Sequence, residues 1–394
     1  MSTTLMLAFN FPPLGGGIAR MMGELALRYP PGSLLISTGT LPGSETSDPT
    51  YPHPIDRVGI HANRLRTING LCLWTARAAS LARRTRPGFA WCDVLKPAGY
   101  PAAWLGARQG LPYGVVAHGT EFLLLDAKIR RSRFKRWTAA QMLGRCSVIV
   151  ANSRWTADLA RTVIVSLGDR VPAIDVRVVP LGTTPSQFRP GIDPTPVRRK
   201  YGLDGGGPWI LTVARLDYHK GIDTVINALP AIRAAFPGTC YAVAGVGIRQ
   251  PHLERQIAQL GLGESVRLLG FVPEAELPAL YNAADVFVLD SRRFDLLVEG
   301  FGIAIVEAAA CGLPVVGGRS GGIPESVRDG ETGLVIEPDD PAAVVAAVTR
   351  LLGDGDLRAR LGAAGRQAVE RYYNWDRVAA ELMAIDREFR RDHS

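Results

Sequence analysis

Short, continuous apolar runs alternate with segments of helical periodicity along the first half of the chain. Runs such as LMLAFNF, SLLIST and SVIVANS predict buried strands, because strands covered on both faces are apolar at consecutive positions. The segments that follow, among them residues 18–29 and 71–84, repeat apolar residues every three to four positions and predict amphipathic helices. Ser153 is a suitable N-cap for the helix RWTADLART. This repetition predicts a mainly parallel sheet that is covered on both faces.

The same alternation begins again after residue 207. The strand-like runs PWILTVARL, CYAVAGVG, SVRLLGFV, DVFVLD and LPVVGG are separated by helical segments such as IDTVINALPAIRAAF and IAIVEAAAC. Between the two series lies GTTPSQFRPGIDPTP, which is rich in Pro, Gly and Thr and suits a linker. We therefore predict an α/β protein with an N-terminal domain over residues 1–181 and a C-terminal domain over residues 182–373. A final helix over residues 374–394 is expected to pack back on the N-terminal domain.

The composition agrees with a globular protein of two domains. The chain has 394 residues, of which 47% are hydrophobic and 21% charged. Its five cysteines are scattered and never form a close pair, which speaks against a disulfide framework or a zinc site and predicts a reducing cytoplasm. The N-terminal segment lacks a basic region, so we expect no signal peptide. No run approaches the ~20 apolar residues of a membrane span, so we expect the chain not to cross a membrane.

Positive charge is concentrated in the first half of the chain. The net charge is +8, yet residues 1–181 alone carry 22 basic against 10 acidic side chains. The densest segment is KIRRSRFKRW at 128–137, where cations are interleaved with Ile129, Phe134 and Trp137. Such a segment suits an anionic membrane surface, although a solvated helix face is an equal alternative. Nucleic acid is not expected as a partner, since no recognition module is present. The predicted membrane contacts are Arg130, Arg131, Lys135 and Arg136.

A glycine-rich turn follows the first predicted strand. The segment LAFNFPPLGGGIAR places Gly15 and Gly17 at the first and third positions of a dinucleotide-binding fingerprint. The sixth position, however, holds Arg20, where a bulky side chain disturbs the close packing that the third glycine of that fingerprint permits. The pattern therefore disfavours a dinucleotide-binding oxidoreductase. A glycine loop made for some other ligand is the alternative that this pattern leaves open.

Two cations in the second half flank the start of a predicted helix. In VARLDYHKGID, a buried strand ends at Arg215, and Lys220 and Gly221 precede the helix. Unpaired N–H groups at a helix N-terminus and two fixed cations can bind an anion and stabilise a departing diphosphate. The alternative is a surface loop with two ordinary basic residues.

Two glutamates stand eight positions apart around a glycine-rich segment, EGFGIAIVE. Glu307 is the only charge within an apolar helix and needs a partner, which ribose hydroxyls could supply, whereas Gly302 leaves room for a ligand against the backbone. A satisfied buried carboxylate or a capping role is the alternative for this glutamate. Asp354 and Asp356 form an Asp-x-Asp pair, but their context favours a helix N-cap over a metal site. No metal site is predicted.

Together these motifs resemble the retaining enzymes of glycosyltransferase family 4 over nearly the whole chain. The likeness rests on the E-x(7)-E motif at 299–307 and on PPLGGGIAR, AHGTEF, VIVANSRWT, VPLGTTPSQFRP, ARLDYHKG, GGIPESVRDGETGLVI and YYNWDRVA. The glycine loop and the segment from VEGFGI to GRSGG are most similar to the phosphatidylinositol mannosyltransferase group. The resemblance implies the GT-B architecture, in which two Rossmann-like domains with parallel sheets face each other across a cleft.

The resemblance also implies roles for individual residues. Arg215 and Lys220 would bind the donor diphosphate and take up charge as it leaves. Glu299 would hold hydroxyls of the donor sugar, and Glu307 would hold the ribose. His118 would contact the transferred sugar from the N-terminal domain, and it is counted with Arg215, Lys220 and Glu299 as catalytic. Further donor contacts would come from the backbone of Gly15, Gly16, Gly17, Gly300, Phe301 and Gly302.

The implied function is a retaining α-glycosyltransferase that uses no cofactor. Likeness to the subgroup suggests GDP-mannose as the donor and a lipid-linked or glycan hydroxyl as the acceptor. The implied mechanism is metal-independent and front-face, so that the leaving phosphate itself takes the acceptor proton. A UDP-sugar donor, a nucleotide-sugar epimerase or hydrolase of the same architecture, and an inactive lectin-like or scaffold protein are the alternatives. We expect a cytoplasmic protein that lies peripherally on the inner face of the cell membrane.

Three segments depart from the family pattern. The loop at 243–251 lacks the Gly-Asp-Gly-Pro run that is common there. Asp290, Ser291 and Arg292 stand where a Pro-Ser run is frequent. The segment at 53–74 matches nothing in the family and is expected to line the acceptor side.

Overall fold

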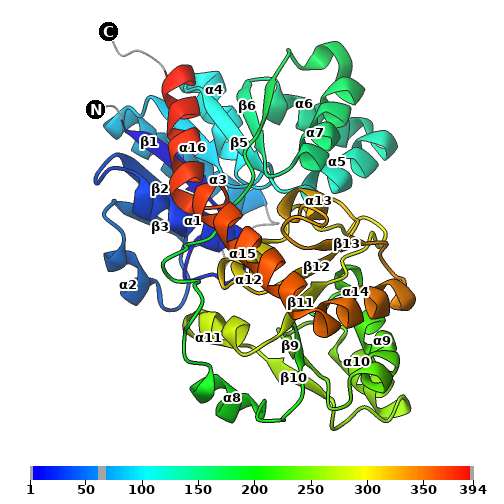
Figure 1. The fold of residues 1–394 in the computed structure, drawn as a ribbon. Coiled ribbons are helices and arrows are strands. Elements are labelled where there is room, and N and C mark those ends of the chain that lie inside the picture. Colours follow the sequence, from blue (N-terminus) through cyan, green and yellow to red (C-terminus); the bar gives the residue numbers. More distant parts are fainter. Residues whose placement is uncertain (1–2, 61–67, 391–394) are drawn as a thin grey trace. The chain divides into compact units, whose positions relative to one another are not determined.

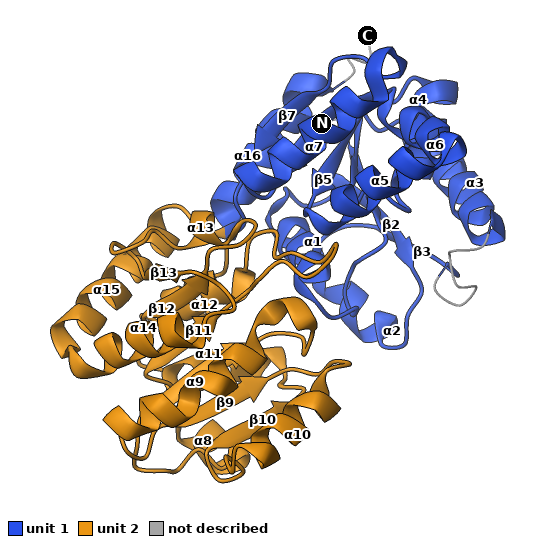
Figure 2. Ribbon diagram, turned by 90° about the vertical axis from the view of Figure 1, so that its right-hand side faces the viewer, with its two compact units in different colours: residues 1–181, 375–394 blue, residues 182–374 orange. Residues whose placement is uncertain are grey.

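The chain forms two compact units in a computed structural model that describes residues 3–60 and 68–390. Unit 1 contains residues 1–181 and 375–394, and unit 2 contains residues 182–374 (Figure 2). Each unit is built around one parallel sheet. The prediction of two Rossmann-like α/β domains is therefore confirmed.

Unit 1 has a seven-stranded sheet in the order β3-β2-β1-β4-β5-β6-β7, and all its pairs are parallel. The strands are β1 Thr4–Ala8, β2 Leu34–Gly39, β3 Ile55–Val58, β4 Phe89–Cys92, β5 Tyr113–Ala117, β6 Cys146–Ala151 and β7 Asp175–Val178. The helices are α1 Gly17–Arg28, α2 Ser44–Ser47, α3 Ile68–Thr85, α4 Gly99–Gln109, α5 Thr120–Arg131, α6 Arg133–Leu143, α7 Arg154–Leu167 and α16 Trp375–Phe389.

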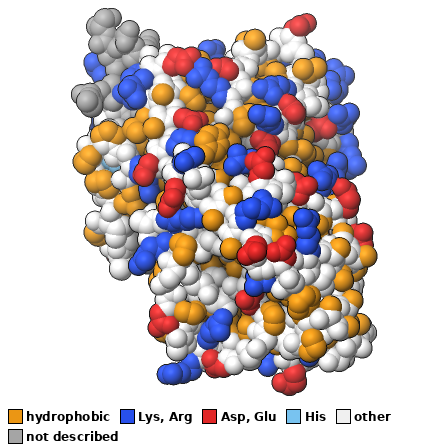
Figure 3. Space-filling model, viewed as in Figure 1, with side chains coloured by type: hydrophobic (Ala, Val, Ile, Leu, Met, Phe, Trp, Pro, Cys, Tyr) orange, Lys and Arg blue, Asp and Glu red, His pale blue; other side chains and the backbone are white. Residues whose placement is uncertain are grey.

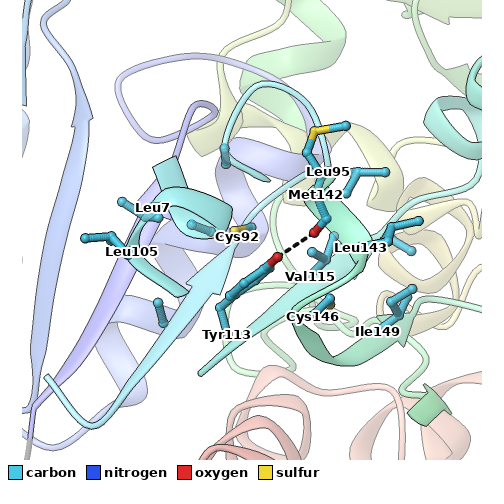
Figure 4. Packing of buried hydrophobic residues seen from close by; sticks show 14 of the residues in the cluster. Leu7, Cys92, Leu95, Leu105, Tyr113, Val115, Met142, Leu143, Cys146 and Ile149 are labelled. Atoms are coloured by element: carbon cyan, nitrogen blue, oxygen red, sulfur yellow. Dashed lines mark hydrogen bonds between the residues drawn. The ribbon is translucent and has the colours of Figure 1, made fainter. Parts of the chain in front are cut away.

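The core of unit 1 lies between the sheet and the helices α3 to α7. Cys92 and Cys146 pack there as apolar side chains beside Val115 and Ile149, and the Tyr113 hydroxyl donates to the Met142 carbonyl (Figure 4). Helices α1 and α16 pack against each other on the opposite face of the sheet (Figure 1). Ser153 accepts a hydrogen bond from the backbone of Thr156, which confirms the predicted N-cap of α7.

Helix α16 returns to unit 1 after the chain has passed through unit 2. Arg28 on α1 pairs with Asp376 at 2.6 Å. Near the other end of the helix, the Thr4 hydroxyl donates to the buried carboxylate of Asp386. Strand β1 and helix α1 therefore fix both ends of α16.

Unit 2 has a six-stranded parallel sheet in the order β10-β9-β8-β11-β12-β13. The strands are β8 Trp209–Val213, β9 Cys240–Ala244, β10 Val266–Gly270, β11 Val286–Leu289, β12 Val315–Gly318 and β13 Leu334–Ile336. The helices are α8 Thr195–Tyr201, α9 Ile222–Ala235, α10 Gln250–Gln259, α11 Leu277–Asn282, α12 Ile303–Ala310, α13 Ile323–Ser326, α14 Pro341–Gly353 and α15 Gly355–Arg371. The Asp354 side chain accepts from the Leu357 backbone, so the predicted cap of α15 is confirmed.

Strand order reverses direction once in each sheet. The reversal lies between β1 and β4 in unit 1 and between β8 and β11 in unit 2. At such a point the crossover helices leave to opposite faces, and the loops at the carboxyl ends of the two strands open a crevice for ligands. The chemistry-bearing residues of this chain are therefore best sought directly after β1, β4, β8 and β11.

Candidate functional site

Lys220 and Glu299 meet at the point in unit 2 where strand order reverses. Lys220 lies on the loop after β8 and Glu299 on the loop after β11, and the Lys220 ammonium pairs directly with the Glu299 carboxylate. The two side chains are 13% and 18% exposed, so the pair is partly shielded from water. Arg215, on the same loop as Lys220, is 73% exposed and pairs with Asp217 at 3.0 Å. Two of the predicted cations thus lie on one loop, and one of them contacts the predicted sugar-binding carboxylate.

Glycines bring these loops close enough for contact. A Cβ atom at Gly221 would lie 1.9 Å from the Asp290 carbonyl oxygen, and one at Gly321 would lie 2.1 Å from the Glu299 carbonyl oxygen. Both residues also have a positive φ. The Gly322 N–H donates to the Glu299 carbonyl at 3.0 Å. Only glycine permits this approach, which fixes the backbone on both sides of the ion pair.

Glu299 is ionised in this setting. Burial alone raises the pKa of its carboxyl, but the charge of Lys220, together with a smaller effect of Arg215, holds that pKa below its ordinary value. A carboxylate with free lone pairs can accept hydrogen bonds from sugar hydroxyls. An ammonium beside it keeps donors for a phosphate oxygen, so the pair can hold both parts of a sugar phosphate.

His219, the buried neighbour of Lys220 in the chain, was missed by the sequence analysis. It is 4% exposed, and its Nδ1 has no hydrogen-bond partner within residues 3–60 and 68–390. Burial, reinforced by the charge of Lys220, lowers the pKa of His219 to about 4. The imidazole is therefore neutral, and the positive charge of the loop is confined to Arg215 and Lys220. The only sequence signal was its position between two polar residues in DYHKG.

The predicted backbone contacts at 300–302 lie at the start of α12. Gly302 is the N-cap of this helix with φ 89°, and a Cβ there would lie 2.8 Å from the Ile323 side chain. Its glycine is thus needed for backbone conformation and internal packing, whatever ligand lies nearby. Phe301 is buried, with its ring 6.0 Å from that of Tyr373. The N-terminus of α12, which carries a partial positive charge, lies at the end of the loop that contains Glu299.

Glu307 has a partner inside unit 2. It lies on α12, is 3% exposed, and accepts a hydrogen bond of 2.8 Å from the Tyr281 hydroxyl. The sequence alternative of a satisfied buried carboxylate is therefore present in the structure. Its contact with a ribose stays a prediction.

Exposed apolar side chains follow the two strands on the β10 side of the reversal. Val246 and Ile248, after β9, are 51% and 79% exposed, and Phe271, after β10, is 73% exposed. The loop after β9 is held by hydrogen bonds from Ala214 and Leu216 to Ala244 and Val246. In strand order, these apolar residues are followed by Arg215 and Lys220 after β8 and by Glu299 after β11. The sequence analysis missed these three residues, although apolar residues placed directly after strands were a signal.

In unit 1 the glycine loop connects β1 to α1. Gly16 has φ 111°, which favours glycine, and α1 begins at Gly17. A Cβ atom at Gly15 or Gly16 would meet no atom within 4 Å. The loop therefore leaves space beside its backbone for a ligand, as the sequence suggested.

His118, Asp93 and Asn10 converge at the reversal point of unit 1. The Nε2 atom of His118 donates to the Asp93 carbonyl oxygen at 2.8 Å, which fixes the orientation of the ring. The Asp93 carboxylate is fully buried and accepts from the backbone and side chain of Asn10 at 2.7 and 2.9 Å. Burial raises the pKa of Asp93 to about 6, although Asn10 and His118 oppose the shift. Sequence reasoning found His118 and missed the other two, each a polar residue just after a strand.

The predicted membrane contacts lie on α5 and α6. Phe134 and Trp137 are 63% and 56% exposed and stack at 6.0 Å, with the Lys135 ammonium 5.8 Å from the Phe134 ring. Lys and Arg side chains gather over these helices at the upper right of Figure 3. Arg130 pairs with Asp126 at 2.7 Å, and Arg131 is exposed, whereas Arg136 is partly covered. Ile129 was expected to join the surface but is buried, because it lies on the core-facing side of α5.

Neither a membrane-spanning helix nor a metal-binding cluster is found in the described part of the chain. None of the helices in residues 3–60 and 68–390 is both long and apolar enough to span a bilayer. The same residues contain no group of three or more His, Cys, Asp or Glu side chains arranged to hold a metal ion. Of the segment at 53–74, residues 61–67 lie outside the described residues, and β3 occupies part of the remainder.

Two family models match the chain, one in each half. The first, described as Glycosyltransferase Family 4, matches residues 16–187. The second, described as Glycosyl transferases group 1, matches residues 194–368. The first match lies mainly in unit 1 and the second lies in unit 2.

Curated relatives match over almost the full length. GDP-mannose-dependent alpha-(1-6)-phosphatidylinositol monomannoside mannosyltransferase from Mycolicibacterium smegmatis is 39% identical over 393 residues, and the match covers 97% of each chain. The protein of the same name from Mycobacterium tuberculosis is 31% identical over 414 residues with the same coverage. D-inositol 3-phosphate glycosyltransferase from Acidothermus cellulolyticus is 29% identical, covering 90% of this chain and 77% of its own.

Solved structures share the fold. HepE from Anabaena in complex with UDP has a TM-score of 0.78 at 20% identity, covering 98% of this chain and 100% of that one. Sucrose-phosphate synthase from Thermosynechococcus elongatus has the same score and identity and covers 98% of both chains.

Proposed function

This chain belongs to glycosyltransferase family 4, and from that premise we propose that it is a retaining mannosyltransferase that uses GDP-mannose. The proposed acceptor is a hydroxyl of a lipid-linked or glycan mannoside. That it is a glycosyltransferase follows from the family and its relatives. The donor, the acceptor and the retaining stereochemistry are what we propose beyond this.

The contact between Lys220 and Glu299 carries the proposal. It joins a cation suited to phosphate with a carboxylate suited to sugar hydroxyls, at the reversal point of the unit 2 sheet. The apolar residues after β9 and β10 would face the nucleobase, and Arg215 with Lys220 would bind the diphosphate. A nucleotide sugar laid along this edge from β10 toward β11 would place its base, diphosphate and sugar opposite these groups in that order.

The proposed chemistry needs only charges that the chain supplies. The bond between the sugar C1 and the diphosphate oxygen breaks, and the acceptor oxygen forms a new bond to C1 on the same face. The acceptor proton passes to an oxygen of the leaving diphosphate, whose negative charge Arg215 and Lys220 stabilise. In unit 1, His118 would contact the transferred sugar and the loop at 15–17 would bind phosphate or acceptor. We therefore propose a metal-independent reaction without a cofactor, and rate enhancement from positioning and fixed charge.

Mannose and the lipid acceptor are supported by the relatives. Two of them, at 39% and 31% identity over 97% of this chain, are named as GDP-mannose-dependent and as acting on phosphatidylinositol monomannoside. Exposed cations and stacked aromatic residues on α6 would bring the protein to an anionic membrane where such an acceptor resides. We therefore propose a peripheral position at the cytoplasmic face of the cell membrane.

Thermal unfolding with nucleotides tests the donor. The purified protein is heated with GDP, UDP or ADP, each with EDTA or with Mg²⁺. A ligand present at 100 times its dissociation constant stabilises a protein by about 2.7 kcal/mol. Selective stabilisation by GDP in EDTA is expected, and Lys220→Ala should lose it, whereas Lys200→Ala, on an exposed pair with Glu276, should keep it. Preference for UDP would overturn GDP-mannose, and no response to any nucleotide would overturn the donor site.

Product analysis tests the reaction itself. Radiolabelled GDP-mannose is incubated with vesicles that contain phosphatidylinositol monomannoside, and the product is digested with α- and β-mannosidase. Release of the label by the α-specific enzyme alone is expected. Label released as free mannose in the absence of acceptor would instead identify a hydrolase.

A further inference from the structure

Arg292 is a nearly buried cation on the loop that leads from β11 to Glu299. Its side chain is 12% exposed. One terminal nitrogen donates to the Thr224 hydroxyl at 2.8 Å and to Asp339 at 2.7 Å, and the other donates to Asp223 at 2.7 Å. All of these partners belong to unit 2. The guanidinium is therefore held by three side chains of the same unit.

Two of these contacts hold the first turn of α9, which begins two residues after Lys220. Asp223 and Thr224 are the second and third residues of α9. On the other side of Lys220, the backbone N–H of Arg292 donates to the His219 carbonyl at 3.0 Å. One residue thus binds the chain just before and just after Lys220.

The turn between those two points is closely packed as well. Gly221 lies so near the Asp290 carbonyl oxygen that a Cβ atom would be 1.9 Å away. Beside it, the Tyr218 ring stacks on Phe294 with centroids 4.4 Å apart, and the Arg249 guanidinium lies 4.0 Å from the Tyr218 ring. The loop of Lys220 is therefore tied at several places to the loop that carries Glu299.

We propose that Arg292 is a positioning residue for the donor diphosphate. By holding His219, Asp223 and Thr224, it fixes Lys220 at Glu299 and thereby sets where the ammonium meets a phosphate oxygen of a nucleoside diphosphate. This inference rests on the proposed function, since the ligand of Lys220 is the diphosphate of the donor. It assigns a role to a position where this chain departs from the family pattern.

The planar shape of arginine explains why this residue type is needed. The two terminal nitrogens of Arg292 donate hydrogen bonds to Asp339 and Asp223 at the same time. A lysine has the same charge but a single nitrogen on a flexible stem, so it cannot hold both carboxylates in a fixed geometry. Arg292→Lys should therefore weaken diphosphate binding as much as Arg292→Gln does. Unlike Arg292→Gln, it keeps the net charge of the loop unchanged.

A double-mutant cycle tests the inference. Binding of GDP and of guanosine is measured by calorimetry for the wild type, Arg292→Gln, Arg292→Lys, Lys220→Ala and Arg292→Gln/Lys220→Ala. Arg293→Gln removes one charge from the next position of the same loop, where the side chain is exposed, and serves as the matched control. If the wild type prefers UDP, UDP and uridine replace GDP and guanosine.

Both Arg292 variants are expected to weaken GDP binding about tenfold and to leave guanosine binding unchanged. In the Lys220→Ala background, Arg292→Gln should cause no further loss, since its effect passes through Lys220. Equal losses for GDP and guanosine, an additive loss in the double variant, or a similar loss in Arg293→Gln would overturn the inference. A wild type that binds neither nucleoside diphosphate contradicts the proposed function and this inference with it. A wild type that binds GDP, with Arg292→Gln unaffected, overturns the inference alone.

Discussion

The pKa values of ionisable side chains in the loops of unit 2 are raised for some residues and lowered for others by their surroundings. Glu299 is kept charged by Lys220, whereas His219 is kept neutral by burial and by the same lysine. Burial raises the pKa of Asp290 to about 7, although the Asp339 backbone, Thr224 and Arg292 favour its charged form. Among these groups, the charged ones that a ligand can meet at this edge are therefore Lys220 and Glu299, whereas His219 is neutral.

The titration of Asp290 predicts a pH-dependent stability. Because its pKa is about 7 in the folded protein and near 4 when unfolded, its contribution to stability is present below pH 4 and lost as the pH rises to about 7. Asp290→Asn removes this titration. The unfolding free energy of the variant, relative to the wild type, should therefore increase between pH 5 and pH 8 by on the order of a few kcal/mol. Chemical denaturation at several pH values measures this difference, in which other titrations cancel, and a constant difference would contradict it.

We expect that breaking the Lys220–Glu299 pair lowers the transfer rate more than it lowers the stability of the fold. Lys220→Met should lower kcat by about 10²–10³-fold, as expected for loss of a fixed charge on a leaving group. Lys200→Met breaks an exposed pair of the same unit, with Glu276 at 2.7 Å, and should leave kcat unchanged. Steady-state transfer rates compare the two variants. Equal rates for Lys220→Met and the wild type would show that this lysine does not take part in the reaction.

At the scale of single elements, α6 presents a surface with two different properties. Its buried residues Ala139, Ala140, Met142 and Leu143 pack into the unit 1 core. Its first turn, together with the end of α5, exposes cations beside the stacked pair of Phe134 and Trp137. The helix is therefore anchored on one side and free to meet a partner on the other.

Binding to anionic vesicles tests this element. Neutralising Arg130, Arg131, Lys135 and Arg136 to Gln should reduce binding to vesicles with 30% anionic lipid by at least about tenfold, since each cation near such a surface contributes about 1 kcal/mol. The matched control replaces four exposed arginines of unit 2 by Gln, namely Arg199, Arg255, Arg350 and Arg371. Co-sedimentation at low and high salt measures the effect. Equal losses in both variants would mean that net charge, and not this surface, is responsible.

On the scale of the whole molecule, each unit has its own hydrophobic core. One core cluster comprises residues of unit 1 only and the other comprises residues of unit 2 only. The chain completes unit 1 with α16 after it has built unit 2. Separate cores predict separate unfolding steps, so a single two-state transition is not expected.

A tryptophan variant can distinguish the two steps. Unit 2 contains one tryptophan, Trp209, and the other six lie in unit 1. In Trp209→Phe, intrinsic fluorescence reports on unit 1 alone, whereas circular dichroism reports on both units. GDP should raise the midpoint seen only by circular dichroism, because the proposed contacts with the nucleobase and those of Arg215 and Lys220 lie in unit 2. A shift of the fluorescence midpoint by the same amount would mean that the units unfold together.

The sequence by itself determined the features that depend on near neighbours along the chain. Hydrophobic runs and helical periodicity identified most strands and helices, and the caps at Ser153 and Asp354 lie where side-chain chemistry placed them. The edge strands β3 and β13 were not identified, because β3, with the sequence IDRV, contains two charged residues and is only partly buried, and β13 has only three residues. Glycine and charge spacing also drew attention to Lys220 and Glu299.

Only the tertiary structure decided which strand ends are neighbours. Lys220 and Glu299 are 79 positions apart and meet because β8 pairs with β11, and Asp93 reaches Asn10 because β4 pairs with β1. The fourfold engagement of Arg292 and the partner of Glu307 likewise follow from packing between elements. Strand order is set by how crossover helices pack over the whole sheet, and no local pattern of residues contains that information.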